Sequence, residues 1–286
     1  TMENNITIIS RTEAKVDIKV QEEASGMKGY YISTDNTKPT EESNWIEQSL
    51  KEFTIERLST DTTYYIWLLD NVGNISETQE IVVGNVNYQI DGNETTVTLA
   101  EAISKATDGS TIELLSDYTD TSTATFDKNV TFDVKGYTLT RDKTITINSG
   151  EEIEITGTGK ITSGANSVRT ITNNGTLTIS NSVTIENMST SSSNAPIYTS
   201  NSNSITNIND NVQIIGNYRG IYNYYGTVNV NGGKIEAVYE GSSAYGIYVA
   251  GSSSKVYINN GEIKGYYGIY SSILEMTGGK IIGTGA

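Results

Sequence analysis

The N-terminal part of the chain alternates apolar and polar residues at short range. In segment 14–20, Ala, Val and Ile occupy every second position and charged residues the others, which predicts a half-buried antiparallel strand. Similar runs recur between residues 4 and 83, and segment 70–74, Asp-Asn-Val-Gly-Asn, gives a turn signal after one of them. About seven strands in such a short stretch predict a β-sandwich.

A repeat with a longer period dominates the C-terminal part. One strand start recurs at intervals of 26, 26, 24, 26 and 22 residues, at Ile145, Ile171, Ile197, Ile221, Ile247 and Ile269. Two further short apolar strands follow within each period, and no helical pattern separates them. The repeat therefore predicts a three-sided solenoid whose coils stack at the strand spacing of about 4.8 Å.

The segments between these strands support the same fold. Three triplets occupy the same place in successive periods: 231–233 (Asn-Gly-Gly), 259–261 (Asn-Asn-Gly) and 277–279 (Thr-Gly-Gly). Gly and Asn tolerate positive φ at such corners, and stacked Asn side chains can bond between coils. Upstream, Thr98 and Glu101 have the spacing of a capping box, which predicts a short helix that covers the first coil.

Residue types missing from the chain exclude several kinds of chemistry. There is no Cys and no His, which excludes disulfides, thiolate or imidazole metal ligands, a thiol nucleophile and a Ser-His-Asp triad. The net charge of −15 argues against nucleic-acid binding. No apolar run approaches the ~20 residues of a membrane span. We expect no cofactor and no metal site.

The charge is distributed unevenly, which indicates two modules. Residues 1–128 contain nine basic and 23 acidic residues (9 − 23 = −14), and residues 129–286 contain ten and 11 (10 − 11 = −1). In the second part, Lys234, Glu262 and Lys280 each precede an inward Ile. We expect them to form an outward column of alternating sign, which is a structural feature.

Two family resemblances refine these predictions. Segment 58–64, with Leu-x-x-x-Thr-x-Tyr spacing, resembles the corner of fibronectin type III-like and bacterial Ig-like modules of Gram-positive surface proteins. The repeat resembles the right-handed parallel β-helix of the pectate-lyase-like superfamily, and the handedness is implied by that resemblance alone. The predicted fold is all-β: a β-sandwich over 1–84, then a parallel β-helix with a short N-terminal capping helix over 85–286.

The β-helix resemblance implies a possible enzyme, since many such proteins cleave acidic polysaccharides with clustered acids and a basic residue. From residue 156 onward, however, no two acids occupy matching positions in adjacent periods. Arg219 with Asp210 is the best candidate pair, and a solvated loop is its plainer explanation. Fold does not determine function, and we expect no catalysis.

Tyrosine is the more informative residue type. Twelve of the 19 tyrosines lie between residues 198 and 270. If the repeated isoleucines point inward, Tyr198, Tyr222, Tyr248 and Tyr270 point outward on one sheet. Such a column could stack on sugar rings or contact a protein. Alternatively, it packs only on itself, or a loop such as 239–245 covers it.

The favoured interpretation is a non-catalytic fragment of a bacterial cell-surface or secreted protein. The sandwich acts as a spacer, and the β-helix presents a face for adhesion to a glycan or a host or cell-surface protein. The alternatives are a polysaccharide-active lyase or glycoside hydrolase with its site largely outside residues 1–286, and a purely structural stalk. Segment 283–286 (Gly-Thr-Gly-Ala) has no polar cap, so we expect the native chain to continue.

Overall fold

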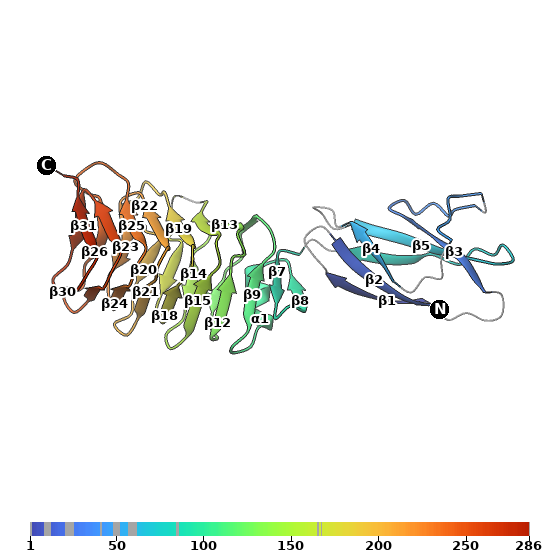
Figure 1. The fold of residues 1–286 in the computed structure, drawn as a ribbon, viewed down its shortest axis with the longest axis horizontal. Coiled ribbons are helices and arrows are strands. Elements are labelled where there is room, and N and C mark those ends of the chain that lie inside the picture. Colours follow the sequence, from blue (N-terminus) through green and yellow to red (C-terminus); the bar gives the residue numbers. More distant parts are fainter. Residues whose placement is uncertain are drawn as a thin grey trace. The chain divides into compact units, whose positions relative to one another are not determined.

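The computed structural model describes residues 2–8, 13–20, 26–40, 42–47, 52–56, 62–83, 86–164, 166 and 168–285. The chain divides into two compact units, residues 1–86 and 87–286. The described part is almost entirely β-structure, with one helix (Figure 1).

The N-terminal unit contains six described strands in two antiparallel sheets of three. One sheet has the order β1 (Met2–Ile8), β2 (Glu13–Val20), β4 (Glu52–Glu56). The other has the order β3 (Met27–Ser33), β5 (Thr62–Asp70), β6 (Gln79–Val83). The strand expected over 14–20 is thus confirmed as β2. Residues 58–61 of the fibronectin-type motif lie outside the described residues, so that motif stays a prediction.

The predicted turn after β5 is formed by side-chain hydrogen bonds. The Asp70 carboxylate accepts from the backbone N–H of Val72 (3.0 Å) and of Asn74 (2.7 Å). Gly73 has a φ of +95°, a conformation that glycine adopts without steric cost. The Asp-x-x-Gly-Asn pattern therefore reverses the chain as expected.

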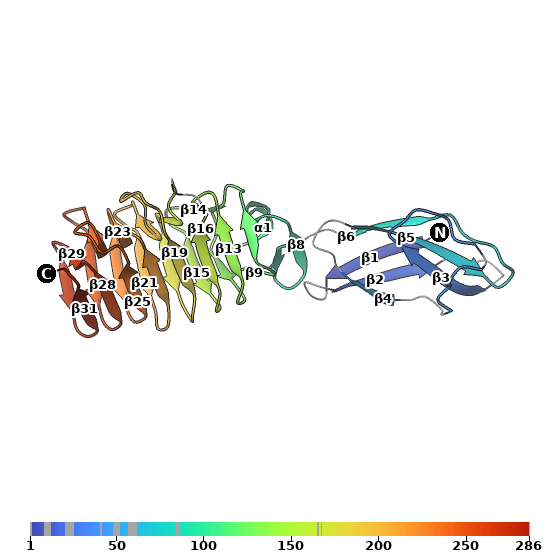
Figure 2. The ribbon, with the colours of Figure 1, turned by 90° about the horizontal axis from the view of Figure 1, so that it is seen from above.

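The C-terminal unit is a parallel β-solenoid, as predicted. Each coil contributes one strand to each of three sheets, and seven complete coils and part of an eighth are described (Figures 1 and 2). The first sheet contains β9 (Thr111–Leu114), β12 (Val130–Asp133), β15 (Glu152–Thr156), β18 (Thr176–Ile179), β21 (Ile205–Ile208), β24 (Thr227–Val230), β27 (Lys255–Ile258) and β30 (Leu274–Met276). The second contains β10 (Tyr118–Asp120), β13 (Thr138–Arg141), β16 (Lys160–Ser163), β19 (Thr184–Asn187), β22 (Gln213–Gly216), β25 (Lys234–Ala237), β28 (Glu262–Gly265) and β31 (Lys280–Gly283). The third contains β11 (Thr125–Phe126), β14 (Ile145–Ile147), β17 (Ile171–Asn173), β20 (Ile197–Thr199), β23 (Arg219–Asn223), β26 (Tyr245–Val249) and β29 (Tyr267–Tyr270).

The repeated isoleucines have the register that the sequence predicts. In the third sheet, Ile197 pairs with Ile221 and Ile221 with Ile247. All three side chains are fully buried. Because successive side chains point to opposite faces of a strand, the residues beside them face outward. The solenoid core is thus a stack of aliphatic side chains in vertical register.

A helix and a hairpin cover the first coil. Helix α1 (Leu99–Lys105) begins with the predicted capping box, in which the Thr98 hydroxyl accepts from the Glu101 N–H and the Glu101 carboxylate from the Thr98 N–H. Strands β7 (Tyr88–Ile90) and β8 (Glu94–Thr96) pair antiparallel, and β7 extends the first sheet beside β9. Leu99 and Ile103 are buried in the solenoid core, so the apolar end of the first coil is covered.

The corner triplets also stack as expected. Asn231 donates to Asn209 of the preceding coil (Nδ2–Oδ1, 3.1 Å), and Asn259 donates to Asn231 (2.9 Å). Thr277 donates to Asn259 and completes the ladder (Oγ1–Oδ1, 3.2 Å). The last glycine of each triplet has positive φ: Gly233, Gly261 and Gly279. The ladder links four successive coils.

Candidate functional site

The four predicted tyrosines form one outward column on the third sheet. Tyr198 pairs in register with Tyr222, Tyr222 with Tyr248, and Tyr248 with Tyr270. The first three side chains are half-buried and Tyr270 is 56% exposed. The strand period fixes this arrangement, since each tyrosine follows an isoleucine of the core. The structure therefore brings together all four residues that the sequence singled out.

Neighbouring rings of this column are in contact. The centroids of Tyr198 and Tyr222 are 5.1 Å apart with planes at 74°, and those of Tyr222 and Tyr248 are 5.4 Å apart at 72°. Tyr248 and Tyr270 are stacked at 5.3 Å and 13°. These are the edge-to-face and offset-stacked geometries that aromatic pairs favour, each worth about 0.5–1.5 kcal/mol beyond the buried area.

A second column runs beside the first and contains two arginines. Arg219 pairs in register with Tyr245, and Tyr245 with Tyr267. Arg169 and Ala195 stand two residues before the paired Ile171 and Ile197, as Arg219 stands two residues before Ile221. Sequence analysis considered Arg219 only as a partner for an acid and did not foresee this column. The register of the sheet was the signal that could have revealed it.

The side chains of the two columns interdigitate. The guanidinium carbon of Arg169 lies 3.4 Å from the centroid of Tyr198. That of Arg219 lies 4.2 Å from Tyr222 and 4.3 Å from Tyr248, so it contacts the tyrosines of its own and the next coil. A cation over an aromatic face is attracted by the ring quadrupole, by about 0.5–2 kcal/mol depending on exposure. The rings thus hold both guanidinium groups in fixed places.

Further tyrosines border these columns on exposed positions, among them Tyr224 and Tyr225 after β23. Tyr224 contacts Tyr222 with ring centroids 6.1 Å apart. We call the whole surface the tyrosine face. It comprises Arg169, Tyr198, Arg219, Tyr222, Tyr224, Tyr225, Tyr245, Tyr248, Tyr267 and Tyr270. Of segment 239–245, Tyr245 packs on Tyr248 with ring centroids 5.0 Å apart and so belongs to the face. Tyr239 contacts Tyr218 instead and is 43% exposed.

Both guanidinium groups carry charge that is only partly compensated. Among the described residues, neither Arg169 nor Arg219 forms an ion pair with a carboxylate, and the Nε of each is buried without a hydrogen-bond acceptor. Burial lowers the pKa of Arg219, although the group stays protonated at neutral pH. For Tyr198, burial raises the pKa of the phenol, and this effect exceeds the lowering by the neighbouring Arg169. The face is therefore aromatic with two localised positive charges.

The candidate pair Asp210 and Arg219 is not formed. Arg219 begins β23 in the third sheet, whereas Asp210 lies in the turn that joins the first sheet to the second. No ion pair between them occurs in the described structure, and Arg219 packs on tyrosines instead. Chain proximity did not predict spatial proximity here, because nine residues cross from one side of the coil to another.

The predicted column of alternating charge is present, but its bonding differs. Lys234, Glu262 and Lys280 are in register, yet Lys234 bonds Glu236 of its own strand (Nζ–Oε2, 2.6 Å). Lys264 approaches Glu236 from the next coil at 2.8 Å. Partial burial alone would raise the pKa of Glu236, but hydrogen bonds from both lysines outweigh it and hold that pKa below its ordinary value. These lysines and glutamates therefore form an ion-pair network with a structural role.

A shallow depression of about 360 Å³ lies on the first sheet near the N-terminal end of the solenoid. Its lining includes Glu152 and Glu154, which project from the outer side of β15. Glu154 accepts a hydrogen bond from Ser180 (2.6 Å). Sequence analysis, which weighed the acids after residue 156, missed this pair. No group of three or more acidic side chains suited to a metal ion occurs among the described residues.

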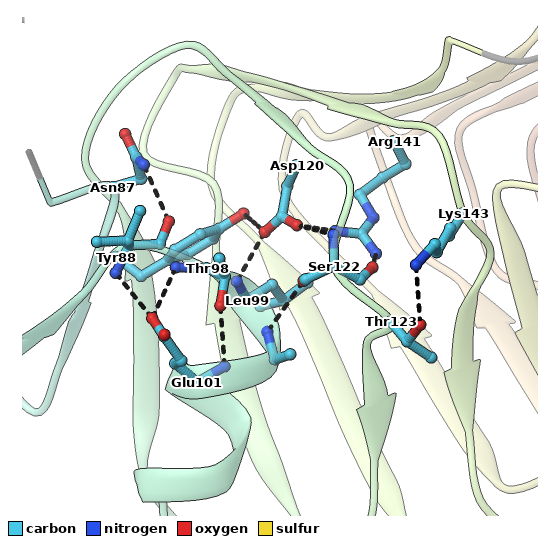
Figure 3. Close-up of polar contacts among 12 residues, drawn as sticks. Asn87, Tyr88, Thr98, Leu99, Glu101, Asp120, Ser122, Thr123, Arg141 and Lys143 are labelled. Carbon is cyan, nitrogen blue, oxygen red and sulfur yellow. Dashed lines mark hydrogen bonds and ion pairs between the residues drawn. The ribbon is translucent and has the colours of Figure 1, made fainter. Parts of the chain in front are cut away.

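The other conspicuous polar cluster is buried in the first two coils (Figure 3). The Asp120 carboxylate pairs with Arg141 (Oδ1–Nη1, 2.7 Å) and accepts from the Tyr88 hydroxyl at 2.9 Å. It also accepts from the backbone N–H of Leu99 (2.7 Å) and of Ser122 (2.7 Å). The Asp120 and Arg141 side chains have no exposed surface. The cluster therefore joins α1 and the first coils rather than meeting a ligand.

Comparison of this chain with known proteins finds no match by sequence and two weakly similar solved structures. No family model matches it, and no curated protein matches it. Among solved structures it is similar to a family 28 exopolygalacturonase of Yersinia enterocolitica (11% identity, TM-score 0.22, 97% of this chain and 81% of that chain). It is also similar to a pectate lyase of Pectobacterium carotovorum (12%, 0.21, 97% and 85%). Similarity this weak supports no conclusion about activity. No described helix is long and apolar enough to cross a membrane.

Proposed function

We propose that this chain is part of a non-catalytic, adhesin-like protein of the bacterial cell surface or of secreted material, and that its solenoid binds a glycan or a protein through the tyrosine face. The observation that carries the proposal is the continuous outward column from Tyr198 to Tyr270, with two guanidinium groups held against its rings. A structural ladder alone does not need two arginines without carboxylate partners.

Physical chemistry favours such a surface for binding. Tyrosine offers a large apolar area with a polar tip, and it loses little conformational entropy when a partner immobilises it. Here packing within the column has already restricted Tyr222 and Tyr248, so the cost of ordering them on binding is lower still. The strands of the third sheet provide a rigid support.

The wider architecture is part of the same proposal. We take the N-terminal unit, with its two antiparallel sheets of three, as an Ig-like or fibronectin type III-like sandwich that acts as a spacer. We take the solenoid as a right-handed β-helix of the pectate-lyase-like superfamily. Extracellular localisation is supported by the acidic composition without cysteine and by the resemblance to Gram-positive surface modules.

The test is a binding screen of the whole chain on glycan and extracellular-protein arrays, with Tyr222→Ala and Tyr248→Ala beside it. Tyr257→Ala is the matched control, since Tyr257 projects outward from the first sheet at an equivalent strand position. We expect the two variants of the third sheet to weaken binding at least tenfold, as truncated interface anchors do, and the control to leave it unchanged. Binding that survives both variants would contradict the proposal and leave the structural stalk.

A second candidate, a polysaccharide-active enzyme, is favoured by the depression that Glu152 and Glu154 line. Glycoside hydrolases use two carboxylates that flank the scissile bond. Incubation of the whole chain with acidic and neutral polysaccharides, followed by reducing-end and unsaturated-product assays, tests this candidate. Activity that Glu152→Gln and Glu154→Gln both abolish would establish catalysis here and contradict the non-catalytic assignment.

A further inference from the structure

The tyrosine face presents ring edges rather than ring faces. Tyr248 and Tyr270 are nearly parallel with centroids 5.3 Å apart, closer than two coplanar rings can lie side by side, so their faces overlap. In the edge-to-face pairs, such as Tyr222 with Tyr248, a neighbour again occupies one ring face. Arg219 takes further face area of the same two rings. What remains for a partner is a row of ring edges and phenol hydroxyls.

Flat sugar binding uses exposed ring faces, whereas a surface of ring edges suits a different ligand. Pro-rich segments in the polyproline II conformation dock on aromatic-lined grooves, and their preformed shape lowers the entropic cost of binding. Their backbone has no internal hydrogen bonds, so their carbonyl groups are free to accept from tyrosine hydroxyls. The geometry of the tyrosine face thus favours an extended peptide over a sugar.

The spacing of the two arginines gives this ligand a register. Arg169 and Arg219 each stand two residues before an isoleucine of the third sheet, and these isoleucines, Ile171 and Ile221, lie two coils apart in register. Two strand spacings amount to about 9.6 Å. A polyproline II helix has three residues per turn and rises about 3.1 Å per residue, so residues i and i+3 lie on one side about 9.3 Å apart. Two acidic side chains three residues apart would therefore reach both guanidinium groups.

We propose that the tyrosine face binds a proline-rich peptide segment of a partner protein in the polyproline II conformation, aligned along the solenoid axis, with acidic residues at i and i+3 opposite Arg169 and Arg219. This inference rests on the proposed binding function and specifies its partner. The complementary charge is supplied by two guanidinium groups that have no carboxylate partner among the described residues. Their guanidinium carbons lie against ring faces, which leaves the outer N–H groups for a carboxylate.

Four nine-residue peptides and the whole chain test this inference. The first is Pro-Pro-Glu-Pro-Pro-Glu-Pro-Pro-Pro, with Glu at i and i+3. The second, Pro-Pro-Glu-Pro-Pro-Pro-Glu-Pro-Pro, has the same composition with Glu at i and i+4. The third replaces Glu by Gln in the first peptide, and the fourth replaces Pro by Gly and Ser. Affinities are measured by fluorescence anisotropy at low and high salt.

We expect the first peptide to bind about fivefold more tightly than the second, the effect of one partly exposed ion pair, and to exceed by more the third, which lacks both ion pairs. The flexible fourth should bind most weakly. Arg169→Gln and Arg219→Gln should each remove the preference for i+3 and flatten the salt dependence. Arg219→Lys should keep the charge and lose part of the preference, because Lys lacks the planar fork. Circular dichroism verifies that each variant is folded.

Other outcomes separate this inference from the proposed function. Equal binding of the first two peptides, or of the rigid and flexible ones, overturns the polyproline II register. If glycans bind, no peptide binds, and Tyr222→Ala abolishes the glycan binding, the proposal of a peptide partner is wrong and the proposed binding face is retained. If neither class binds, or if Tyr222→Ala changes nothing that binds, both proposals fail.

Discussion

Asp120 and Arg141 form a buried ion pair in the first coils of the solenoid. We predict that replacing Asp120 destabilises the solenoid more than replacing Arg141. In Asp120→Ala, Arg141 loses its carboxylate and keeps the Ser122 carbonyl as its described partner. In Arg141→Met, Asp120 still accepts from the Tyr88 hydroxyl and from the N–H groups of Leu99 and Ser122. The first variant leaves a poorly compensated buried charge, and the second leaves a charge with three donors.

Magnitudes follow from this difference. Removal of one partner of a buried ion pair costs about 3–5 kcal/mol when the other charge stays uncompensated, and we assign that range to Asp120→Ala. Arg141→Met should cost less, about 1–3 kcal/mol, because the hydrogen bonds to Asp120 remain. The double variant should be more stable than the sum of the two costs predicts, since no isolated charge is left. In a unit of about 200 residues, 3–5 kcal/mol lowers Tm by roughly 6–20 °C.

Thermal unfolding followed by far-ultraviolet circular dichroism measures these effects. Both tryptophans, Trp45 and Trp67, lie in the N-terminal unit, so tryptophan fluorescence follows that unit separately. Lys280→Met is the surface control, because Lys280 is exposed and 3.9 Å from Glu262, and it should cost well under 1 kcal/mol. Equal losses in Asp120→Ala and Arg141→Met, or costs that simply add in the double variant, would refute the reasoning.

Three more predictions concern the stability of the solenoid. Burial alone would raise the pKa of Asp120, but hydrogen bonds from Ser122 and Leu99 and the charge of Arg141 hold that pKa below its ordinary value. The ionised carboxylate therefore stabilises the fold at neutral pH, and this stabilisation is lost as the pH falls below about 4. Between pH 6 and pH 3, urea unfolding should show a smaller loss of folding free energy in Asp120→Asn than in the parent chain. Gly261 and Gly150 share a φ of +92°, but a Cβ on Gly261 would lie 2.6 Å from the Gly232 carbonyl oxygen, whereas one on Gly150 would meet nothing within 4 Å. Gly261→Ala should therefore lower Tm clearly more than Gly150→Ala. Equal shifts in Tm would contradict the close approach at Gly261. Asn231→Ala removes one donor and one acceptor of the corner ladder and should cost about 1–2 kcal/mol by chemical denaturation, whereas no change would show that the ladder contributes nothing.

The solenoid was predictable because its stability comes from a repeat. Every period must place apolar side chains inward at the same three places, and Ile221, Ile247 and Ile269 show this directly in the sequence. Corner residues also repeat for a local reason, because the corners at Gly233 and Gly261 require positive φ, which glycine adopts without steric cost. Strand β21 departs from the pattern, since Thr206 stands where the two neighbouring strands have Leu177 and Val228. It is buried and accepts a hydrogen bond from Asn173 of the preceding coil.

Buried polar residues of this kind could not be predicted, because their partners are set by coil register and not by neighbouring sequence. Asn173 and Asn223 point inward in the third sheet, where an apolar residue is the expectation, and each is fully buried. Asn223 accepts from Thr199 of the coil before it, and Asn173 donates to the Ile205 carbonyl. A buried amide is stable only when it is hydrogen-bonded, and the solenoid supplies these bonds from adjacent coils.

The same argument applies to the tyrosine face. Side chains alternate between the two faces of a strand, and Tyr222 follows the buried Ile221. The sequence could therefore predict that Tyr222 points outward. Capture of Arg219 between Tyr222 and Tyr248 depends instead on Tyr248, 29 residues further along the chain, meeting Arg219 across one strand spacing. An arginine in the sequence has many possible partners, and only the register of Ile221 with Ile247 places the next coil's tyrosine beside it.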